Sequence, residues 1–245
     1  MKRRTFADLE SKQVAFYLPK FRKFHDDVRS LGWRDKESQV FRFEALEQLF
    51  YHEKRRDFSI HEIGCGLGHF YEYLRQKNYD VDYSGSDIVG ELIDRCRKLY
   101  PDGSFSQTCI IEDIKKLKRT IGGADYYCLI GVFNPIGNNS KKIWEDFILQ
   151  SVSNMFLLAK KGIAFNFLTS HSDYYDKDLY YADPGKMLNW CVGNLSRYVS
   201  LHHDSAAYDF TVYVYKDAFI ESLYPYIVKR KNERRLQQNK GIKQR

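Results

Sequence analysis

The stretch that decides the fold reads His61-Glu62-Ile63-Gly64-Cys65-Gly66-Leu67-Gly68. Three glycines at alternate positions follow a short apolar strand, expected over residues 58–63, and open a helix expected over residues 70–76. Glycine lets the chain turn sharply and leaves no side chain in the way of a ligand. The spacing Gly-x-Gly-x-Gly differs from the Gly-x-Gly-x-x-Gly of dinucleotide-binding sites. The carboxylate of Glu62 favours a ligand with an ammonium group over one with a phosphate.

Strand and helix continue to alternate after this loop. Repeated strand–helix units predict an α/β protein with a doubly wound, mostly parallel sheet. Such sheets bind ligands at the carboxyl ends of their strands. The last two strands are separated by a short turn and predict an antiparallel hairpin, which brings the expected number of strands to seven. The later strands are expected over residues 81–86, 105–110, 124–132, 163–168, 198–203 and 210–215, and the later helices over residues 89–99, 142–159 and 184–195.

The positive charge of the chain is concentrated at one end. The formal net charge is +7, from 39 Lys and Arg and 32 Asp and Glu residues. Residues 229–245 hold eight basic residues and one Glu, so residues 1–228 hold 31 of each sign and are neutral. A basic surface for nucleic acid is therefore not expected on the body. We divide the chain into a helical cap (1–55), a core (56–216) and a C-terminal helix with a basic tail (217–245).

Composition also bears on compartment and metal content. The five cysteines are scattered without a Cys-x-x-Cys pair, which favours reduced thiols in a cytoplasmic protein. No Cys/His spacing suits zinc, so no metal is expected. No apolar run is long enough to span a membrane, and none follows the charged first residues, so we expect neither a membrane span nor a secretory signal.

Two further segments complete a recognisable pattern. Asp87 ends the second expected strand, and residues 126–134 form a buried strand followed by a polar loop. Residues 62–68 resemble the first motif of the class I S-adenosylmethionine-dependent methyltransferases. Asp87 resembles their second motif, and residues 126–134 resemble their fourth. The resemblance covers roughly residues 38–216. It implies a Rossmann-like fold, an antiparallel last strand inserted near the sheet edge, and S-adenosyl-L-methionine (SAM) as the cofactor.

The resemblance implies a set of cofactor-binding residues at the strand ends. Glu62 would hold the methionine end of SAM, and Asp87 would bind the ribose. The other members of the set come from the glycine loop, from the residue after Asp87 and from the end of the fourth strand: Gly64, Gly66, Gly68, Ile88, Gly131 and Val132.

Two cofactor contacts are less directly implied. Many family members place an Asp after the third strand to bind the adenine, and Cys109 stands at that position here. A backbone N–H near Ile110 would serve instead, or Glu112 and Asp113 after a shift of the loop. A guanidinium can bind the cofactor carboxylate through two hydrogen bonds, and Arg42 is our candidate.

The acceptor is expected beside the long polar segment 169–184. This segment is rich in Tyr, Asp and Ser, which is typical of a binding loop or lid. Its His171 and Asp173 are candidate general bases, and Asn134 is the third catalytic candidate, to orient the acceptor. The candidates for binding the acceptor are Trp33, Phe133, Asn166, Tyr180 and Tyr181.

These features predict methyl transfer to an O or N atom of a small polar acceptor. The pattern is similar to bacterial enzymes for small polar metabolites, some of them in surface-polysaccharide or sugar-nucleotide pathways. One alternative is an RNA- or ribosome-directed methyltransferase docked by the basic tail, and another is a non-catalytic protein that binds SAM or a nucleotide. Residues 134–137 read Asn-Pro-Ile-Gly and lack the second proline and the aromatic of amino-methylating nucleic-acid enzymes. Nucleic acid is therefore not the expected partner, and we expect a monomer or homodimer.

Overall fold

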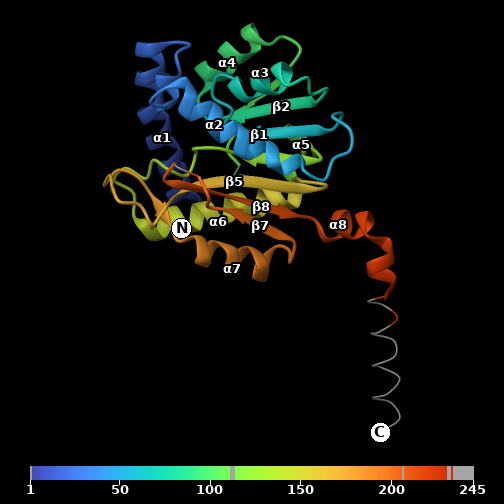
Figure 1. Cartoon of the computed structure of the whole chain (residues 1–245). Helices are drawn as coiled ribbons and strands as arrows, with labels where there is room; N and C mark the ends of the chain where they lie inside the picture. The colour runs from blue at the N-terminus through green and yellow to red at the C-terminus, as the bar shows by residue number, and fades with distance from the viewer. Residues whose placement is uncertain (1, 111–113, 206, 231–232, 234–245) are drawn as a thin grey trace.

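The computed structural model describes residues 2–230, apart from 111–113 and 206, together with residue 233. A mixed sheet runs through it in the order β3-β2-β1-β4-β5-β8-β7, and β6 pairs with β5 outside this path (Figure 1). The strands are β1 (Ser59–Ile63), β2 (Asp82–Asp87), β3 (Ser104–Gln107), β4 (Tyr126–Leu129), β5 (Gly162–Thr169), β6 (Tyr181–Ala182), β7 (Val199–His202) and β8 (Asp209–Tyr215).

The topology confirms the fold predicted from the sequence. β1 pairs in parallel with β2 and β4, and β3 and β5 extend the parallel ladder on either side. β8 is inserted antiparallel between β5 and β7. The parallel strand β6, which pairs with β5 through two residues, was not predicted. It lies within the segment that we expected to be a loop.

Helices cover both faces of the sheet. α5, α6 and α7 contribute to one apolar cluster, whereas α2, α3 and α8 contribute to a second cluster on the other face. Along β4, Tyr127 and Leu129 belong to the first cluster, and Tyr126 and Cys128 to the second. Because both faces are covered, β4 has no solvent-facing side and its sequence is continuously apolar. The helices are α1 (Lys2–Phe24), α2 (Lys36–Glu47), α3 (His69–Gln76), α4 (Gly90–Leu99), α5 (Ile114–Thr120), α6 (Lys141–Leu158), α7 (Pro184–Asn194) and α8 (Asp217–Leu223), with 3₁₀ turns η1 (Val28–Leu31) and η2 (Gln48–Phe50).

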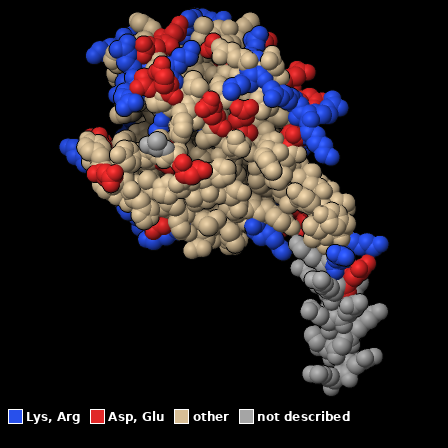
Figure 2. All heavy atoms as spheres, in the orientation of Figure 1, with Lys and Arg blue, Asp and Glu red and all other residues tan. Residues whose placement is uncertain are grey.

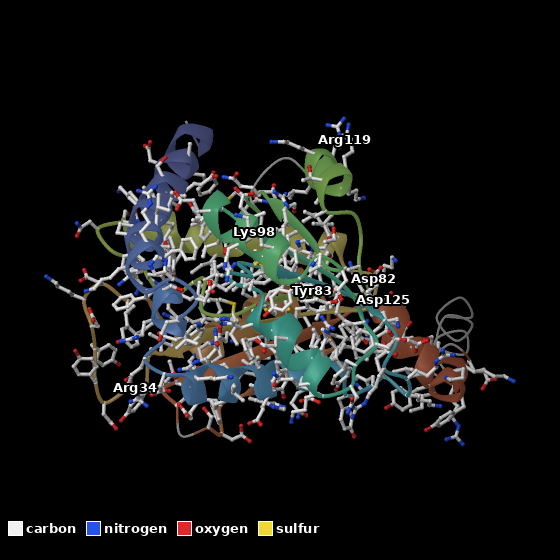
Figure 3. All side chains as sticks on the ribbon, turned by 90° about the horizontal axis from the view of Figure 1, so that it is seen from above. Arg34, Asp82, Tyr83, Lys98, Arg119 and Asp125 are labelled. Atoms are coloured by element: carbon white, nitrogen blue, oxygen red, sulfur yellow. The ribbon has the colours of Figure 1, made fainter. Side chains whose placement is uncertain are left out.

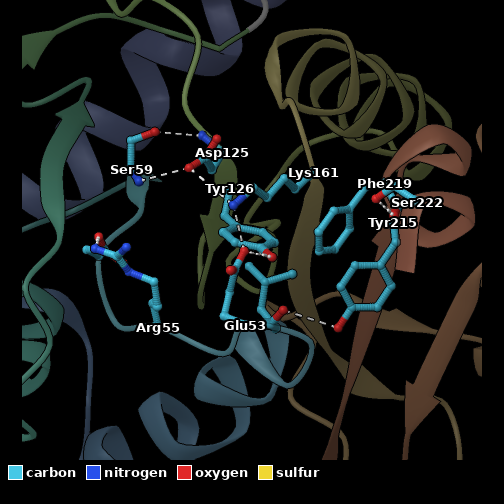
Figure 4. Close-up of polar contacts among 11 residues, drawn as sticks. Glu53, Arg55, Ser59, Asp125, Tyr126, Lys161, Tyr215, Phe219 and Ser222 are labelled. Atoms are coloured by element: carbon cyan, nitrogen blue, oxygen red, sulfur yellow. Dashed lines mark hydrogen bonds and ion pairs between the residues drawn. The ribbon is translucent and has the colours of Figure 1, made fainter. Parts of the chain in front are cut away.

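A polar network joins the amino ends of β1 and β4 (Figure 4). The Ser59 N–H donates to Asp125 Oδ2 at 3.3 Å, and the Asp125 N–H donates to Ser59 Oγ at 2.8 Å. Glu53 Oε1 accepts hydrogen bonds from the Tyr126 hydroxyl at 2.7 Å and from Lys161 Nζ at 2.8 Å. These paired charges and hydroxyls stabilise the end of the sheet opposite to the expected ligand site.

Helix α1 lies across the carboxyl ends of the strands, from the side of α6 to the side of α4 (Figure 1). Gln13 Nε2 donates to Pro135 O at 2.8 Å, in the segment after β4. Near the C-terminal end of α1, Arg22 forms an ion pair of 2.6 Å with Glu91 in the first turn of α4. The helix therefore closes the edge of the sheet where ligands are expected.

The surface of the body carries both charges. Lys and Arg lie interspersed with Asp and Glu over the face seen in Figure 2, in agreement with the neutral sum of residues 1–228. Most of the basic tail lies outside the described residues. Among the helices of the described part, none combines the length and the apolarity that a membrane crossing requires.

Candidate functional site

A cavity of about 540 Å³ lies between α1 and the carboxyl ends of β1, β2, β4 and β5. Its volume is within the range of small-molecule sites, roughly 300–1,000 Å³. It occupies the edge of the sheet that the sequence predicts for a ligand. The predicted site residues that line it are Trp33, Arg42, Glu62, Gly64, Gly66, Asp87, Ile88, Ile110, Gly131, Val132 and Asn134.

The glycine loop is packed against the segment after β4. Gly64 has a φ of 70°, and a Cβ at this residue would lie 2.3 Å from Cγ2 of Val132. The N–H groups of Gly64 and Cys65 both donate to Ser86 O, at 2.7 and 3.0 Å. A glycine is therefore required here because the ends of β1, β2 and β4 meet closely, in addition to any contact with a ligand.

Asp87 is held at the end of β2 by backbone groups. Its Oδ2 accepts from the Gly66 N–H at 3.0 Å, and its Oδ1 accepts from the Val89 N–H at 2.9 Å. Burial raises the pKa of Asp87, while these backbone hydrogen bonds act in the opposite direction. Each carboxylate oxygen retains acceptor capacity beyond its backbone partner. The carboxylate is thus rigid, faces the cavity and is able to accept hydroxyl groups.

Glu62 is a buried carboxyl at the end of β1. It accepts a hydrogen bond from the hydroxyl of Tyr83, which lies in the middle of the molecule in Figure 3. Burial and the nearby Asp87 raise the pKa of Glu62 to about 8, although the hydrogen bond from Tyr83 opposes this shift. A ligand ammonium would supply a positive charge next to this carboxyl. The site therefore suits the cationic end of an amino acid.

The next part of the cavity is lined by Ile88, Cys109 and Ile110. Tyr17 of α1 packs against the same small apolar cluster as Ile88, and it also lines the cavity. Burial and the neighbouring Asp87 raise the pKa of Tyr17, so its hydroxyl is protonated at neutral pH. Ile110 stays our prediction for the adenine contact. The alternative candidates Glu112 and Asp113 lie outside the described residues.

Arg42 lies beside Trp33 at one side of the cavity. Its Nε forms a 2.6 Å ion pair with Asp209, and its guanidinium lies 5.1 Å from the centre of the Trp33 ring. A Cβ on Gly131 would lie 3.0 Å from the Trp33 ring, so this ring covers the loop after β4. Arg42 lines the cavity, where Asp209 already balances its charge, and its contact with the cofactor carboxylate stays a prediction.

The structure does not bring the predicted residues of segment 169–184 to the cavity. His171 and Asp173 are exposed, and the His171 ring instead faces His203 at a centroid distance of 6.2 Å. The Tyr180 hydroxyl donates to Glu145 at 3.3 Å, and the Tyr181 hydroxyl accepts from the Asp176 N–H at 2.9 Å. The reason is the unpredicted strand β6, which pairs this segment with β5 and holds it along the sheet.

Three other predicted residues lie behind the cavity wall. Phe133 is fully buried and stacks on Phe167 with ring centroids 5.2 Å apart. Asn166 Oδ1 accepts from the Gly131 N–H at 2.8 Å, which supports the loop after β4. Gly68 starts α3 in a left-handed conformation. These residues shape the site from behind, without lining it.

Helix α1 supplies lining residues that were not among the predicted site residues. They are spaced three and four residues apart, so they share one helical face. The same spacing can be seen in the sequence of residues 6–17 and could have indicated one buried face of a helix. His69 is a further lining residue that was missed, at the start of α3. The α1 face consists of Phe6, Leu9, Glu10, Gln13, Phe16 and Tyr17.

Solved structures share this fold. The chain aligns with the methyltransferase domain of the bacterial CtHen1-C at a TM-score of 0.53 and 14% identity, over 70% of this chain and 95% of that one. It also aligns with the bifunctional kinase-methyltransferase WbdD at a TM-score of 0.51 and 18% identity, over 78% of this chain and 42% of that one. At these identities, the likeness shows the fold alone. No family model matches the chain.

A sequence relative decides the family. Over 161 residues, the chain is 33% identical to Rv1506c of Mycobacterium tuberculosis (strain ATCC 25618 / H37Rv), which is named as a methyltransferase. The match spans 65% of this chain and 93% of that protein. The chain is a class I SAM-dependent methyltransferase. Its cofactor is SAM, and the buried Glu62 and the backbone-held Asp87 fit the ammonium and the ribose of this molecule.

Proposed function

We propose that this methyltransferase transfers the methyl group of SAM to an O or N atom of a small acceptor. The observation that supports the proposal is one cavity that joins the cofactor-binding strand ends to the face of α1. Glu62 and Asp87 lie at one end of it, and Glu10 and Gln13 of α1 face it from above. All of these groups come from one chain.

We assign the cofactor end as follows. Glu62 binds the ammonium group, Asp87 accepts the ribose hydroxyls, and Gly131 leaves room next to the sulfur. When bound, SAM supplies a methyl group on a positively charged sulfur, which is an excellent leaving group. The protein then contributes mainly by alignment of the acceptor with the methyl carbon. Asn166 accepts a hydrogen bond from the Gly131 N–H, which helps to hold the loop after β4 in place.

The acceptor lone pair forms the new bond to the methyl carbon while the carbon–sulfur bond breaks, and S-adenosylhomocysteine leaves. A hydroxyl acceptor must also lose its proton. Glu10 is our candidate for the general base, because it is the carboxylate that α1 directs toward the cavity. Asn134 is our candidate for orienting the acceptor, since its Oδ1 is buried and unpartnered.

The earlier expectation of a polar sugar acceptor from surface-polysaccharide biosynthesis finds little support in this cavity, whose acceptor end is mainly apolar. RNA is not our first choice either, because the charges of the body balance. A steep loss of RNA affinity with salt, removed together with residues 229–245, would favour the RNA alternative.

A crystal structure with S-adenosylhomocysteine tests the proposal. We expect the amino group beside Glu62, the ribose hydroxyls on Asp87 and the sulfur next to Gly131, with free space left beneath α1. A ligand bound elsewhere, or one that fills the space beneath α1, would contradict the assignment.

A further inference from the structure

We propose that the acceptor is a neutral molecule with an apolar body, an aromatic ring or a short alkyl chain, that presents one hydroxyl or amine to the methyl group. This inference rests on the proposed function, because it identifies the kind of molecule that the space beneath α1 accepts. It follows from the side chains at the end of the cavity formed by α1 and by the segments after β4 and β5.

Apolar side chains form most of the walls at this end, beside Glu10 and Gln13 of α1. Phe6 and Leu9 of α1 face the cavity, and the Phe6 ring lies 6.4 Å from the Phe147 ring of α6. Trp144 of α6 also reaches the cavity, but its Nε1 already donates to Phe133 O at 3.0 Å. The indole therefore presents only carbon surface. Burial of apolar ligand atoms in such a compartment makes the free energy of binding more favourable.

Two leucines continue this surface next to the sheet. Leu168 near the end of β5 and Leu179 before β6 both line the cavity and are half-buried. Together with the aromatic rings, they form a compartment of the apolar kind that holds most small ligands through shape and burial. A few polar groups then set the orientation of the ligand.

Besides Glu10, the proposed base, one further polar group can orient the ligand, and it is a hydrogen-bond acceptor. Asn134 Oδ1 is buried and has no partner, although Asn134 lines the cavity. The amide nitrogen of the neighbouring Gln13 already donates to Pro135 O. A ligand that satisfies Asn134 must carry an N–H or O–H donor, and this is the atom type that SAM-dependent transfer methylates.

A sugar would be bound poorly by the same groups. A sugar carries several hydroxyls, and each one buried without a partner would weaken binding by roughly tenfold. The unpartnered amide oxygen of Asn134 and the carboxylate of Glu10 are too few to satisfy them. The compartment therefore selects against polyhydroxylated acceptors.

The arginines around the cavity do not favour an anionic acceptor. Of the arginines that line it, Arg42 is paired with Asp209 at 2.6 Å, and Arg34 is exposed and paired with Asp35 at 2.6 Å. Figure 3 shows Arg34 at the edge of the molecule. Because both guanidinium groups already have carboxylate partners, an anionic acceptor would find no uncompensated arginine.

The test is calorimetry with a matched series of acceptors, performed in the presence of saturating S-adenosylhomocysteine. We expect 4-methylphenol, 4-ethylphenol, 4-propylphenol and 4-butylphenol to bind, each methylene tightening the Kd about fourfold until the compartment is full. Glucose and UDP-glucose should not bind. A flat phenol series, or tighter binding of UDP-glucose, would overturn the proposed acceptor class.

The titration of S-adenosylhomocysteine alone separates this inference from the proposed function. If S-adenosylhomocysteine does not bind, the proposed cofactor site fails. If it binds and the phenol series is flat, only the acceptor class fails.

A pair of variants locates the binding. Leu179→Asn places a polar side chain in the compartment and should weaken 4-butylphenol about tenfold, with unchanged affinity for S-adenosylhomocysteine. Leu157→Asn makes the same change on α6 at a side chain that is 60% exposed and does not line the cavity, so it should bind like the wild type. Equal 4-butylphenol affinity in both variants would contradict the inference, and the wild-type series decides it if Leu179→Asn does not fold.

Discussion

The two ends of the cavity are built in different ways. At the cofactor end, Glu62, the glycine loop and Asp87 lie within one short stretch of chain and on neighbouring strands. At the acceptor end, Phe6, Phe147 and Leu179 come from segments far apart in the sequence. The first end is polar and held by backbone hydrogen bonds, whereas the second is formed by apolar packing. The cofactor end is therefore visible in a local motif, and the acceptor end emerges only from the fold.

The largest effect should come from closing the gap between β1 and the segment after β4. In Gly64→Ala, the new Cβ would clash with Val132 and the residue would keep a positive φ, so we expect a loss of about 3 kcal/mol of unfolding free energy. Gly122→Ala is the matched control, because Gly122 also has a φ of 70° but has no atom within 4 Å of the added Cβ. It should lose about 1 kcal/mol in the same denaturant titration. Equal losses would show that the close contact at Gly64 is unimportant.

At the acceptor end, Glu10→Gln removes the proposed general base and should lower kcat about 100-fold with an alkylphenol acceptor. The affinity for S-adenosylhomocysteine should stay the same, because Glu10 is assigned to the acceptor and not to the cofactor. Asp8→Asn changes an exposed carboxylate on the same helix and should leave kcat unchanged. A normal kcat in Glu10→Gln would exclude the role of Glu10.

The buried carboxyl of the cofactor end should make stability depend on pH. The pKa of Glu62 is raised to about 8, so between pH 4.5 and 8 the folded state binds more protons at this group than the unfolded state. The stability that Glu62 contributes is complete below this window and is lost as the pH rises through it. As the pH rises from 5 to 7, the wild type should therefore lose about 2 kcal/mol of unfolding free energy that Glu62→Gln does not lose. Denaturant titrations at both pH values would contradict this if the difference between the proteins stayed constant.

The docking of α1 should have a smaller effect. Gln13→Ala removes the hydrogen bond to Pro135 O and should lower the unfolding free energy by about 1 kcal/mol. The control is Lys12→Ala, at the residue before Gln13. This variant removes an exposed hydrogen bond to Asn139 and should change stability very little. If both variants behave alike in denaturant titrations, the link between α1 and the segment after β4 does not hold the helix.

These contrasts explain what the sequence predicted and what it missed. The succession of strands and helices along the chain and the places of Glu62 and Asp87 in β1 and at the end of β2 were predictable, because strand periodicity and a glycine loop are local signals. His171 and Asp173 were expected at the acceptor, but the two-residue strand β6 holds their segment along β5. The pairing of so short a strand depends on long-range packing, which local sequence does not reveal.

The position of helix α1 could not be predicted from the sequence either. Its period of three and four residues predicts a buried stripe, but the sequence does not say which surface the stripe covers. Only the docked helix places Phe6 near Phe147 and Tyr17 near Asp87. The proposal of an acceptor with an apolar body therefore rests on the docked helix and was not accessible from the sequence.

The most direct test of the account is calorimetry with S-adenosylhomocysteine on the wild type, Asp87→Asn and Asp82→Asn. Asp82 is exposed at the other end of the same strand β2, so its variant is a matched control for the loss of one carboxylate charge. We predict one binding site per chain, wild-type affinity in Asp82→Asn and at least roughly tenfold weaker binding in Asp87→Asn, because the buried acceptor for the ribose is changed. Full affinity in Asp87→Asn would contradict the assignment of the cofactor site to the carboxyl ends of β1 and β2.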